Sequence, residues 1–245
     1  MDDLRGAFAI VTGAAQGLGY AIAKAYVNEG MRVALMDVLA ERLSAVVDEL
    51  TEAGGDVLGI PVDLSDAAET DAAIDKALGH FGTPRVVIHS AALLITRSML
   101  EITFEDWQKE VNIILQAAFQ LSKAVWPLMI DAGGGSIVYV SSGSGVKGFI
   151  KEMAYCPGKH AIEGLMKCQA MEGKEYNIAV NTATPGAPMN TPMSEQNYTE
   201  EQKKRWVDPA LLTPAFVFLA KQDASGMTGH RVAARTGNWE ATPSI

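Results

Sequence analysis

The sequence has little cysteine and no long hydrophobic run, and both shortages exclude classes of protein. Its two cysteines in 245 residues, Cys156 and Cys168, are too few for a disulfide framework. No stretch approaches the ~20 apolar residues that cross a bilayer. The first residues, Met1 to Arg5, lack the basic and apolar regions of a signal peptide. We therefore expect reduced thiols in a soluble, cytoplasmic protein that does not enter the membrane.

Positive charge is also scarce. Lys and Arg number 20 against 29 Asp and Glu, which gives a formal net charge of −9 at pH 7. Because no basic run offers a surface for phosphate backbones, the composition argues against nucleic acid as a partner. The four histidines show no metal-ligand spacing, so no metal is expected. With 48 % hydrophobic residues, no repeat and no linker, the chain is predicted to fold as one domain over residues 1–245.

Apolar, β-branched runs alternate with amphipathic stretches along the whole chain. This alternation predicts an α/β fold, a doubly wound, Rossmann-like parallel sheet of about seven strands with helices on both faces. The expected strands are Ala7–Thr12, Arg32–Asp37, Val57–Asp63, Arg85–Ser90, Ser136–Ser141, Ile178–Thr184 and a weaker Arg231–Ala234. The expected helices are Gly17–Glu29, Ala40–Ala53, Asp66–Gly79, Phe104–Met129, Ala154–Lys174 and Pro209–Ala220.

The segment after the sixth strand breaks the pattern. Pro185, Pro188 and Pro192 deny regular structure to its start, and a polar stretch follows to about Lys204. Ligands of an open α/β sheet sit beyond the carboxyl ends of the strands. We therefore expect residues 187–207 to form a substrate-binding lid.

A glycine-rich loop joins the first strand to the first helix. Glycines let the backbone turn tightly and approach a pyrophosphate, whose charge the helix N-terminus stabilises, although a plain strand-to-helix turn would also use them. Asp37 ends the second strand, where a carboxylate accepts hydrogen bonds from an adenosine ribose and repels a 2′-phosphate, and neither Ala15 nor Val38 supplies a cation. NAD is therefore predicted over NADP. The predicted contacts are Gly13, Gln16, Gly17, Leu18, Gly19 and Asp37, with Asp63 and Leu64 for adenine unless Asp63 merely precedes a helix.

Ser142, Tyr155 and Lys159 form a second constellation. Tyr155 and Lys159 are four residues apart and so share a helix face, and Pro157 between them predicts a helix start within a residue or two of Tyr155. A nearby ammonium lowers the pKa of tyrosine from about 10 toward the physiological range. Ser142, which ends the fifth strand, is placed to polarise a reacting oxygen. Each residue alone is unremarkable on a surface, but together with the glycine loop they predict proton transfer through Tyr155 and hydride transfer at a nicotinamide.

These motifs resemble those of the short-chain dehydrogenase/reductase family, in its compact form, over essentially the whole chain. The resemblance implies that Lys159 also binds the nicotinamide ribose and that Asn112 holds a water linking Lys159 to solvent. It further implies cofactor contacts from Ser90, Ala91, Pro185, Gly186 and Thr191. The matching positions are Gly13, Gly17, Gly19, Asp63, Asn112, Ser142, Tyr155, Lys159, Pro185, Gly186 and Thr191.

The same resemblance implies a homotetramer, because members of this family pair their long fourth and fifth helices across a twofold axis. Several apolar residues on these helices are candidates for that interface, unless all of them belong to the internal core. They are Ile113, Leu121, Ile162, Leu165 and Met166.

The chain departs from the family pattern in three places. His89-Ser90-Ala91-Ala92 stands where the family usually has Asn-Asn-Ala-Gly. The loop from Pro185 to Thr191 is one residue longer than is common, and residues 234–237, Ala-Arg-Thr-Gly, replace a frequent Asp-Gly-Gly. None of these departures falls on Ser142, Tyr155 or Lys159.

The leading hypothesis is an NAD(H)-dependent oxidoreductase that interconverts a secondary alcohol and its ketone. One alternative is a 3-oxoacyl thioester reductase using NADPH, which the acidic charge and Asp37 disfavour. Another, of a different class, is a non-catalytic protein that senses the cofactor. The expected partner is a small-molecule substrate, whose pocket is predicted to be lined by Leu93, Ser144, Phe149, Met189, Met193 and Trp206.

Overall fold

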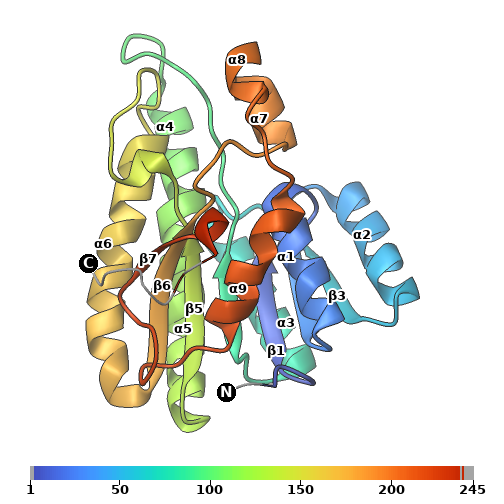
Figure 1. Ribbon diagram of the computed structural model, residues 1–245. Coiled ribbons are helices and arrows are strands. Elements are labelled where there is room, and N and C mark those ends of the chain that lie inside the picture. Colours follow the sequence, from blue (N-terminus) through green and yellow to red (C-terminus); the bar gives the residue numbers. More distant parts are fainter. Residues whose placement is uncertain (1–2, 238, 240–245) are drawn as a thin grey trace.

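The seven predicted strands form a single parallel sheet (Figure 1). The computed structural model describes residues 3–237 and 239. The strand order is β3-β2-β1-β4-β5-β6-β7, so the chain reverses direction across the sheet between β1 and β4. Ligands of such sheets bind beyond the strand ends at this reversal. The strands are β1 (Phe8–Thr12), β2 (Arg32–Asp37), β3 (Asp56–Pro61), β4 (Val86–His89), β5 (Gly135–Val140), β6 (Ile178–Thr184) and β7 (Arg231–Ala233).

Helices cover both faces of the sheet, as predicted, and each face has its own apolar cluster. One cluster takes the buried stripe Leu18, Ile22 and Tyr26 of the first helix, which the sequence spacing predicts. Helices α1 (Gly17–Asn28), α2 (Ala40–Glu52) and α9 (Thr213–Ala220) build this cluster. Helices α3 (Ala67–Phe81), α5 (Ala117–Asp131) and α6 (Tyr155–Gly173) build the other. The arrangement confirms the doubly wound fold.

The predicted helix Phe104–Met129 is longer than expected and is interrupted by a wider turn. It consists of α4 (Phe104–Val111), a π-helical turn η1 (Asn112–Gln116) and α5. By length and composition, Phe104–Asp131 resembles a membrane span. Its inner side, however, is part of the core, because Ile114, Leu121 and Val125 are fully buried there. The predicted helix Pro209–Ala220 likewise begins with a 3-10 turn, η4 (Pro209–Leu212), before α9.

Side chains mark the helix starts. Asp66 accepts backbone hydrogen bonds at the start of α3, and Thr103 accepts one from Asp106 at the start of α4. Helix α6 begins at Tyr155, as predicted, because Pro157 is tolerated in the first turn, where its missing N–H has no helical partner. Helix α1 differs: its N-cap residue, Gln16, makes no capping bond, and its first turn holds no acidic residue.

The expected lid contains two short helices joined by irregular segments. After Pro185 the chain makes a parallel bridge between Met189 and Val207, and two short helices follow. These are α7 (Pro192–Asn197), capped by Thr191, and α8 (Glu200–Lys203), which opens with a capping box between Thr199 and Gln202. Both helices project at the top of Figure 1. The polar stretch is therefore helical, because Thr at each N-cap satisfies the first amides of a turn.

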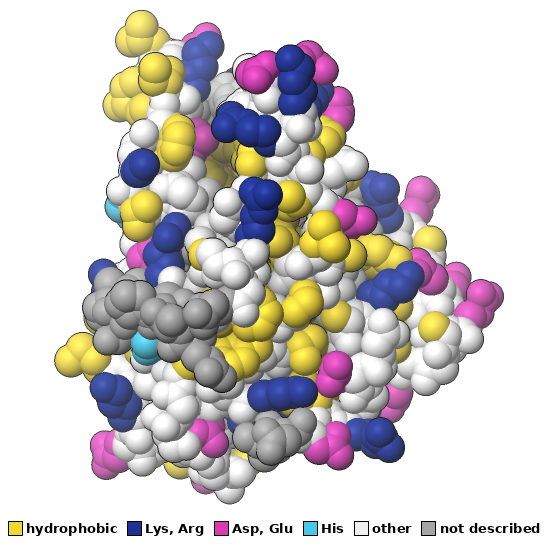
Figure 2. All heavy atoms as spheres, in the orientation of Figure 1, with side chains coloured by type: hydrophobic (Ala, Val, Ile, Leu, Met, Phe, Trp, Pro, Cys, Tyr) yellow, Lys and Arg dark blue, Asp and Glu magenta, His cyan; other side chains and the backbone are white. Residues whose placement is uncertain are grey.

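Three of the five residues predicted for a subunit interface belong to the core instead. Leu121, Ile162 and Met166 are fully buried against the sheet. The exposed apolar side chains lie elsewhere, on the outer side of the same helices and on two loop tips. They include Phe104, Phe119 and Met171 on the helices, and Met99, Leu100 and Ile150 on the tips, where Figure 2 shows apolar side chains at its upper left. These three residues are not available for a subunit interface, because they lie on the helix faces that pack against the sheet.

Candidate functional site

The glycine loop lies at the carboxyl end of β1 and leads into the uncapped N-terminus of α1. Gly13 and Gly17 have φ of +66° and +59°, a region that side chains disfavour. A Cβ at Gly13 would lie 2.9 Å from Ala91 Cα, so only glycine allows this approach. The free amides and positive dipole of α1, with no acidic residue in its first turn, suit a pyrophosphate. The loop therefore fits the predicted dinucleotide.

Thr191 lies against this loop. A Cβ at Gly17 would be 3.2 Å from Thr191 Cγ2, and Thr191 is buried at the start of α7. The start of α7 therefore lies beside the glycine loop even though the Pro185–Thr191 segment is longer than is common. Gly186, also predicted to contact the cofactor, takes φ of +73° in that segment.

The Asp37 carboxylate is held in place by two backbone amides. Oδ2 accepts a hydrogen bond from Ala15 N at 2.9 Å, and Oδ1 accepts one from Leu39 N at 3.0 Å. Asp37 is buried at the end of β2, where the sequence places it for the ribose. A cation missed by the sequence analysis stands nearby, since Arg42 donates to the side chain of Gln16 in the glycine loop. The sequence could have indicated Arg42 as a residue near the ribose site, because it lies in the first turn of α2, only five residues after Asp37.

Asp63 and Leu64 have structural partners. Asp63 Oδ1 accepts hydrogen bonds from Ser65 N at 2.9 Å and from Ser65 Oγ at 2.7 Å, and Lys109 Nζ lies 3.4 Å from its other oxygen. Leu64 is buried in the cluster under α3 and α5. Their contact with adenine stays a prediction.

His89 occupies the place of the first asparagine of the family motif, and both its ring nitrogens are used. Nε2 faces the carbonyls of Ile113 and Ile114, at 2.9 and 3.2 Å, so it must carry the proton. Burial, with the charge of Lys159, lowers the pKa of His89 to about 3, so Nδ1 is unprotonated and accepts from Thr12 Oγ1 at 3.0 Å. Thr12 Oγ1 in turn accepts from the amides of Ser90 and Ala91, both at 3.1 Å.

These bonds connect two parts of the predicted site. Ile113 and Ile114 belong to the π-turn that contains Asn112, and Ser90 and Ala91 are predicted cofactor contacts. A π-turn loses regular helical hydrogen bonds, and His89 supplies a donor to two of its carbonyls. His89, which stands where the family usually has asparagine, therefore makes hydrogen bonds of its own to the π-turn and to Thr12.

We expect His89 to make the protein acid-sensitive. The pKa of His89 is about 3 in the folded protein, against 6.5 ordinarily, so between these values the unfolded chain binds the proton more readily. The free energy of unfolding should therefore fall as pH drops below 6.5, by about 1 kcal/mol per pH unit from this group. Glu110, with its pKa raised by burial to about 7, acts in the opposite direction between pH 7 and 4.5.

The measurement is urea unfolding between pH 4.5 and 8 for the wild type and His89→Asn. The variant still contains Glu110, so the difference in slope isolates the histidine. Its stability should depend less steeply on pH below 6.5, whatever its absolute value. Parallel curves for the two proteins would show that His89 does not stay neutral in the folded state.

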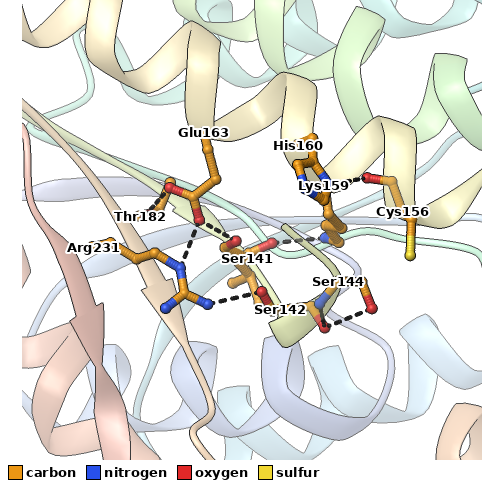
Figure 3. Close-up of polar contacts among 10 residues, drawn as sticks. Ser141, Ser142, Ser144, Cys156, Lys159, His160, Glu163, Thr182 and Arg231 are labelled. Atoms are coloured by element: carbon orange, nitrogen blue, oxygen red, sulfur yellow. Dashed lines mark hydrogen bonds and ion pairs between the residues drawn. The ribbon is translucent and has the colours of Figure 1, made fainter. Parts of the chain in front are cut away.

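Ser142, Tyr155 and Lys159 are brought together at the carboxyl end of β5, and Figure 3 shows Ser142 and Lys159 there. Lys159 Nζ is buried, donates to Val140 O at 2.7 Å and lies 5.4 Å from the centroid of the Tyr155 ring. Ser142 Oγ accepts a hydrogen bond from Ser144 N at 3.2 Å, and its interaction with the Tyr155 hydroxyl acts to lower the pKa of that group. The structure brings these three residues together, and their roles stay a prediction.

The electrostatics of Tyr155 differ from the expectation. Burial raises the pKa of Tyr155, the charges of Tyr198 and Glu152 raise it further, and only the hydrogen bond with Ser142 acts against them. Burial also lowers the pKa of Lys159 to about 8, although the charge of Glu163 opposes this. The protein alone therefore does not lower the pKa of the phenol, because burial of Tyr155 outweighs the interaction that acts to lower it.

A buried ion pair behind Ser142 was missed by the sequence analysis. Arg231 Nε and Glu163 Oε1 are 3.0 Å apart, and Arg231 also donates to the Ser142 carbonyl at 2.8 Å. Glu163 accepts from Ser141 Oγ and, at 2.9 Å, from Thr182 Oγ1, as Figure 3 shows. The pair joins α6, β6 and β7 to the backbone of Ser142. Glu163 was foreseeable as a carboxylate four residues after Lys159, but its partner lies on another strand.

Asn112 is the predicted relay residue. It lies in the π-turn, and its Nδ2 donates to Ser65 O at 3.1 Å. This bond ties the turn to the segment after β3. The proton relay through Asn112 stays a prediction.

A cavity of about 490 Å³ lies between the loop after β4 and the lid. Figure 2 shows the surface hollowed beside the upper-left projection and the helices of the lid. Of the predicted substrate residues, Leu93 lines this cavity, whereas Met189 packs against the apolar core and Phe149 is half exposed. Met193 belongs to α7. The Lys203 ammonium lies over the Trp206 ring, and the Ser144 hydroxyl donates a hydrogen bond to Glu152. The lining residues are Leu93, Leu94, Ile95, Thr96, Arg97, Glu101, Lys151, Gln196 and Asn197.

Several known dehydrogenases and reductases are similar to this chain. The 2,5-dichloro-2,5-cyclohexadiene-1,4-diol dehydrogenase LinX of Sphingobium indicum is 33 % identical over 92 % of this chain and 93 % of its own length. The D-threitol dehydrogenase of Mycolicibacterium smegmatis is 32 % identical over 92 % and 90 %. The structure of L-sorbose reductase from Gluconobacter frateurii, complexed with NADPH and L-sorbose, superimposes with a TM-score of 0.86 at 27 % identity, covering 95 % of this chain and 97 % of that one.

The family pattern described as short chain dehydrogenase matches residues 7–202. This span contains the glycine loop, Asp37 and the Ser142, Tyr155 and Lys159 cluster. The chain therefore belongs to the short-chain dehydrogenase/reductase family, oxidoreductases that use a nicotinamide cofactor on small-molecule alcohols and ketones.

Proposed function

We propose that this protein is an NAD(H)-dependent oxidoreductase that interconverts a secondary alcohol and its ketone. The main support for the proposal is the cluster of Ser142, Tyr155 and Lys159 at the end of β5. This cluster lies at the same edge of the sheet as the glycine loop and the uncapped N-terminus of α1. The names of the relatives support substrates with several hydroxyl groups, since a diol, a tetritol and a ketose are among them.

In this proposal Tyr155 moves the proton. When the alcohol is oxidised, the phenolate oxygen of Tyr155 accepts the hydroxyl proton, and on reduction the phenol returns it. Ser142 donates a hydrogen bond to the same substrate oxygen. A nicotinamide cofactor bound at the glycine loop would supply or accept the hydride and, in its oxidised form, would add a positive charge. Since burial raises the pKa of Tyr155, positive charge close to the phenol is needed, and Lys159 provides the part that belongs to the chain.

The choice of NAD rests on Asp37. A 2′-phosphate would place like charges close together, and at 4 Å with an effective dielectric of about 20 each pair of unit charges costs roughly 4 kcal/mol. If a third of this survives screening, NAD is favoured about tenfold. Arg42 beside Gln16 works against this preference, and a relative of known structure binds NADPH.

We therefore expect wild-type kcat/KM with a secondary alcohol or polyol to be at least tenfold higher with NAD than with NADP. Asp37→Ser together with Val38→Arg should reverse the preference, because the repulsion is lifted and arginine suits a phosphate. Reduced cofactor formed from a panel of alcohols, polyols and hydroxy acids is the readout. The single variant Arg42→Ala is the control for the existing cation and should lower use of NADP only. A wild type that prefers NADP would refute the choice of cofactor, and absence of turnover throughout would refute the activity.

Three further features belong to this proposal. Residues 187–207 act as a lid over the substrate, since Thr191 anchors them at Gly17 and Asn197 donates to Leu94 O at 3.2 Å across the cavity. A homotetramer is favoured by the exposed apolar residues Phe104, Phe119 and Met171 rather than by the buried residues of the same helices. We propose the cytoplasm as the compartment, because the composition is acidic and both cysteines are free thiols.

A further inference from the structure

A carboxylate without a role in the proposed proton transfer lies next to Tyr155. Glu152 precedes α6, and its Oε2 accepts hydrogen bonds from Ser144 Oγ at 2.7 Å and from Cys156 Sγ at 3.2 Å. Ser144 Oγ also lies 3.3 Å from Ser142 Oγ, so a chain of polar groups runs from the predicted reacting position to this carboxylate. Ser144 and Cys156 are drawn on the side of Ser142 away from Glu163 in Figure 3.

Glu152 faces the lid as well as Tyr155. Its charge raises the pKa of Tyr198, the residue that follows α7, in addition to that of Tyr155. Its neighbour Lys151 lines the cavity of about 490 Å³, together with Asn197, the residue before Tyr198. The carboxylate is therefore close to the oxygen that a substrate would present to Tyr155 and to the cavity that would receive the rest of the substrate.

The position of Glu152 is built into the backbone. Lys151 takes φ of +66°, which is unusual for a residue with a side chain, and its carbonyl accepts from Arg97 N at 2.8 Å. Arg97 and Glu152 also form a parallel bridge between the two loops. Strained backbone of this kind is common at functional sites, and here the contacts with the loop of Arg97 hold it in place.

The charges around the cavity favour a neutral ligand. The cation Arg97 is paired with Asp106 at 3.2 Å, and Lys151 interacts with Glu101. Glu152, by contrast, makes no ion pair within the part of the chain that the structure describes. Glu110, which is buried nearby, has its pKa raised to about 7 by burial and supplies no compensating cation. A carboxylate on the ligand would be repelled, whereas a hydroxyl would donate to Glu152.

We propose that Glu152, with Ser144, binds a second hydroxyl group next to the reacting carbon, so that the substrates are neutral vicinal diols and their hydroxy ketones. The proposal rests on the proposed function and names its substrate class. The separation of the Ser142 and Ser144 hydroxyls is comparable to that of the two oxygens in a vicinal diol. Hydrogen bonds to a carboxylate are stronger than neutral ones, and a site built for a hydroxyl rejects an analogue that lacks it.

The test compares three cyclic substrates of similar size: 1,2-cyclohexanediol, cyclohexanol and 2-hydroxycyclohexanecarboxylate. The wild type should use the diol at least 100-fold better in kcat/KM than cyclohexanol, and the hydroxy acid worst. Glu152→Gln should lose at least 30-fold on the diol, mainly in KM, with little change on cyclohexanol and a gain on the hydroxy acid. Ser144→Ala, which keeps the carboxylate, should lose less on the diol.

The matched control is Glu172→Gln, an exposed residue near the other end of α6, which should change no ratio. Equal use of diol and cyclohexanol by the wild type would overturn the proposal while leaving the oxidoreductase intact. Equal losses on both alcohols in Glu152→Gln would also overturn it, since the residue would then support Tyr155 rather than select the substrate. Turnover of none of the three with either cofactor would instead refute the proposed function, and the substrate class with it.

Discussion

Tyr155→Phe is expected to lower kcat by at least a hundredfold while leaving the Kd for NADH nearly unchanged. The substitution removes one hydroxyl, the group that is proposed to exchange a proton with the substrate, and general acid–base groups contribute 10²–10⁴-fold in rate. The ring itself stays, and Lys159 keeps its bond to the Val140 carbonyl. Initial rates with a substrate in excess and titration of cofactor fluorescence measure the two quantities separately.

The control for this variant is Tyr176→Phe, which removes the same hydroxyl from an exposed tyrosine after α6. It should retain full activity. If Tyr155→Phe kept more than a tenth of the wild-type rate, Tyr155 would not be the proton-transfer group. Full activity in the variant would mean that another group transfers the proton.

Gly19→Ala should abolish cofactor binding and strongly destabilise the fold. A Cβ at Gly19 would lie 2.1 Å from Gly13 O and 2.7 Å from Gly13 C, and both are backbone atoms that cannot rotate away. Either α1 or the glycine loop must move, and overpacking of this kind costs about 3 kcal/mol or more. We expect the Kd for NADH to rise at least a hundredfold and the melting temperature to fall by several degrees.

Gly79→Ala provides the matched control, because Gly79 lies inside α3 and a Cβ there would meet nothing within 4 Å. Alanine is favoured over glycine inside a helix by about 1 kcal/mol, so this variant should melt slightly higher and bind NADH normally. Thermal unfolding and cofactor titration of both variants decide the matter. Normal NADH affinity in Gly19→Ala would mean that α1 and the glycine loop can separate without cost to the site.

The order of strands and helices can be predicted from the sequence, because strands that are covered on both faces of the sheet appear as continuous apolar runs. The seven strands match the apolar runs within two residues at their ends, and the stripe of Leu18, Ile22 and Tyr26 points into the core as its spacing requires. The start of α6 at Tyr155 was set by Pro157, a local steric effect. The glycine loop and the Tyr155 and Lys159 pair are equally local, since each is read from residues only a few positions apart.

Other features depend on residues far apart in the chain. The π-turn that begins at Asn112 has no local signal in the sequence, and His89, 24 residues before Ile113, donates a hydrogen bond to the Ile113 carbonyl in that turn. Leu121 has the apolar character of an interface residue, and only the packing of α5 on the sheet assigns it to the core. The direction of the Tyr155 pKa shift is also decided by tertiary structure, because desolvation depends on how much protein surrounds the phenol.

By itself the sequence determined the fold class, the glycine loop and the three residues expected to transfer the proton, since periodicity and short spacings encode them. Tertiary structure alone decided what surrounds those residues. It placed Arg231 of β7 beside Glu163 of α6 and set Glu152 between Tyr155 and the lid. The physical reason is that hydrogen bonds and charges act over a few ångströms in space, whatever the separation of their residues along the chain.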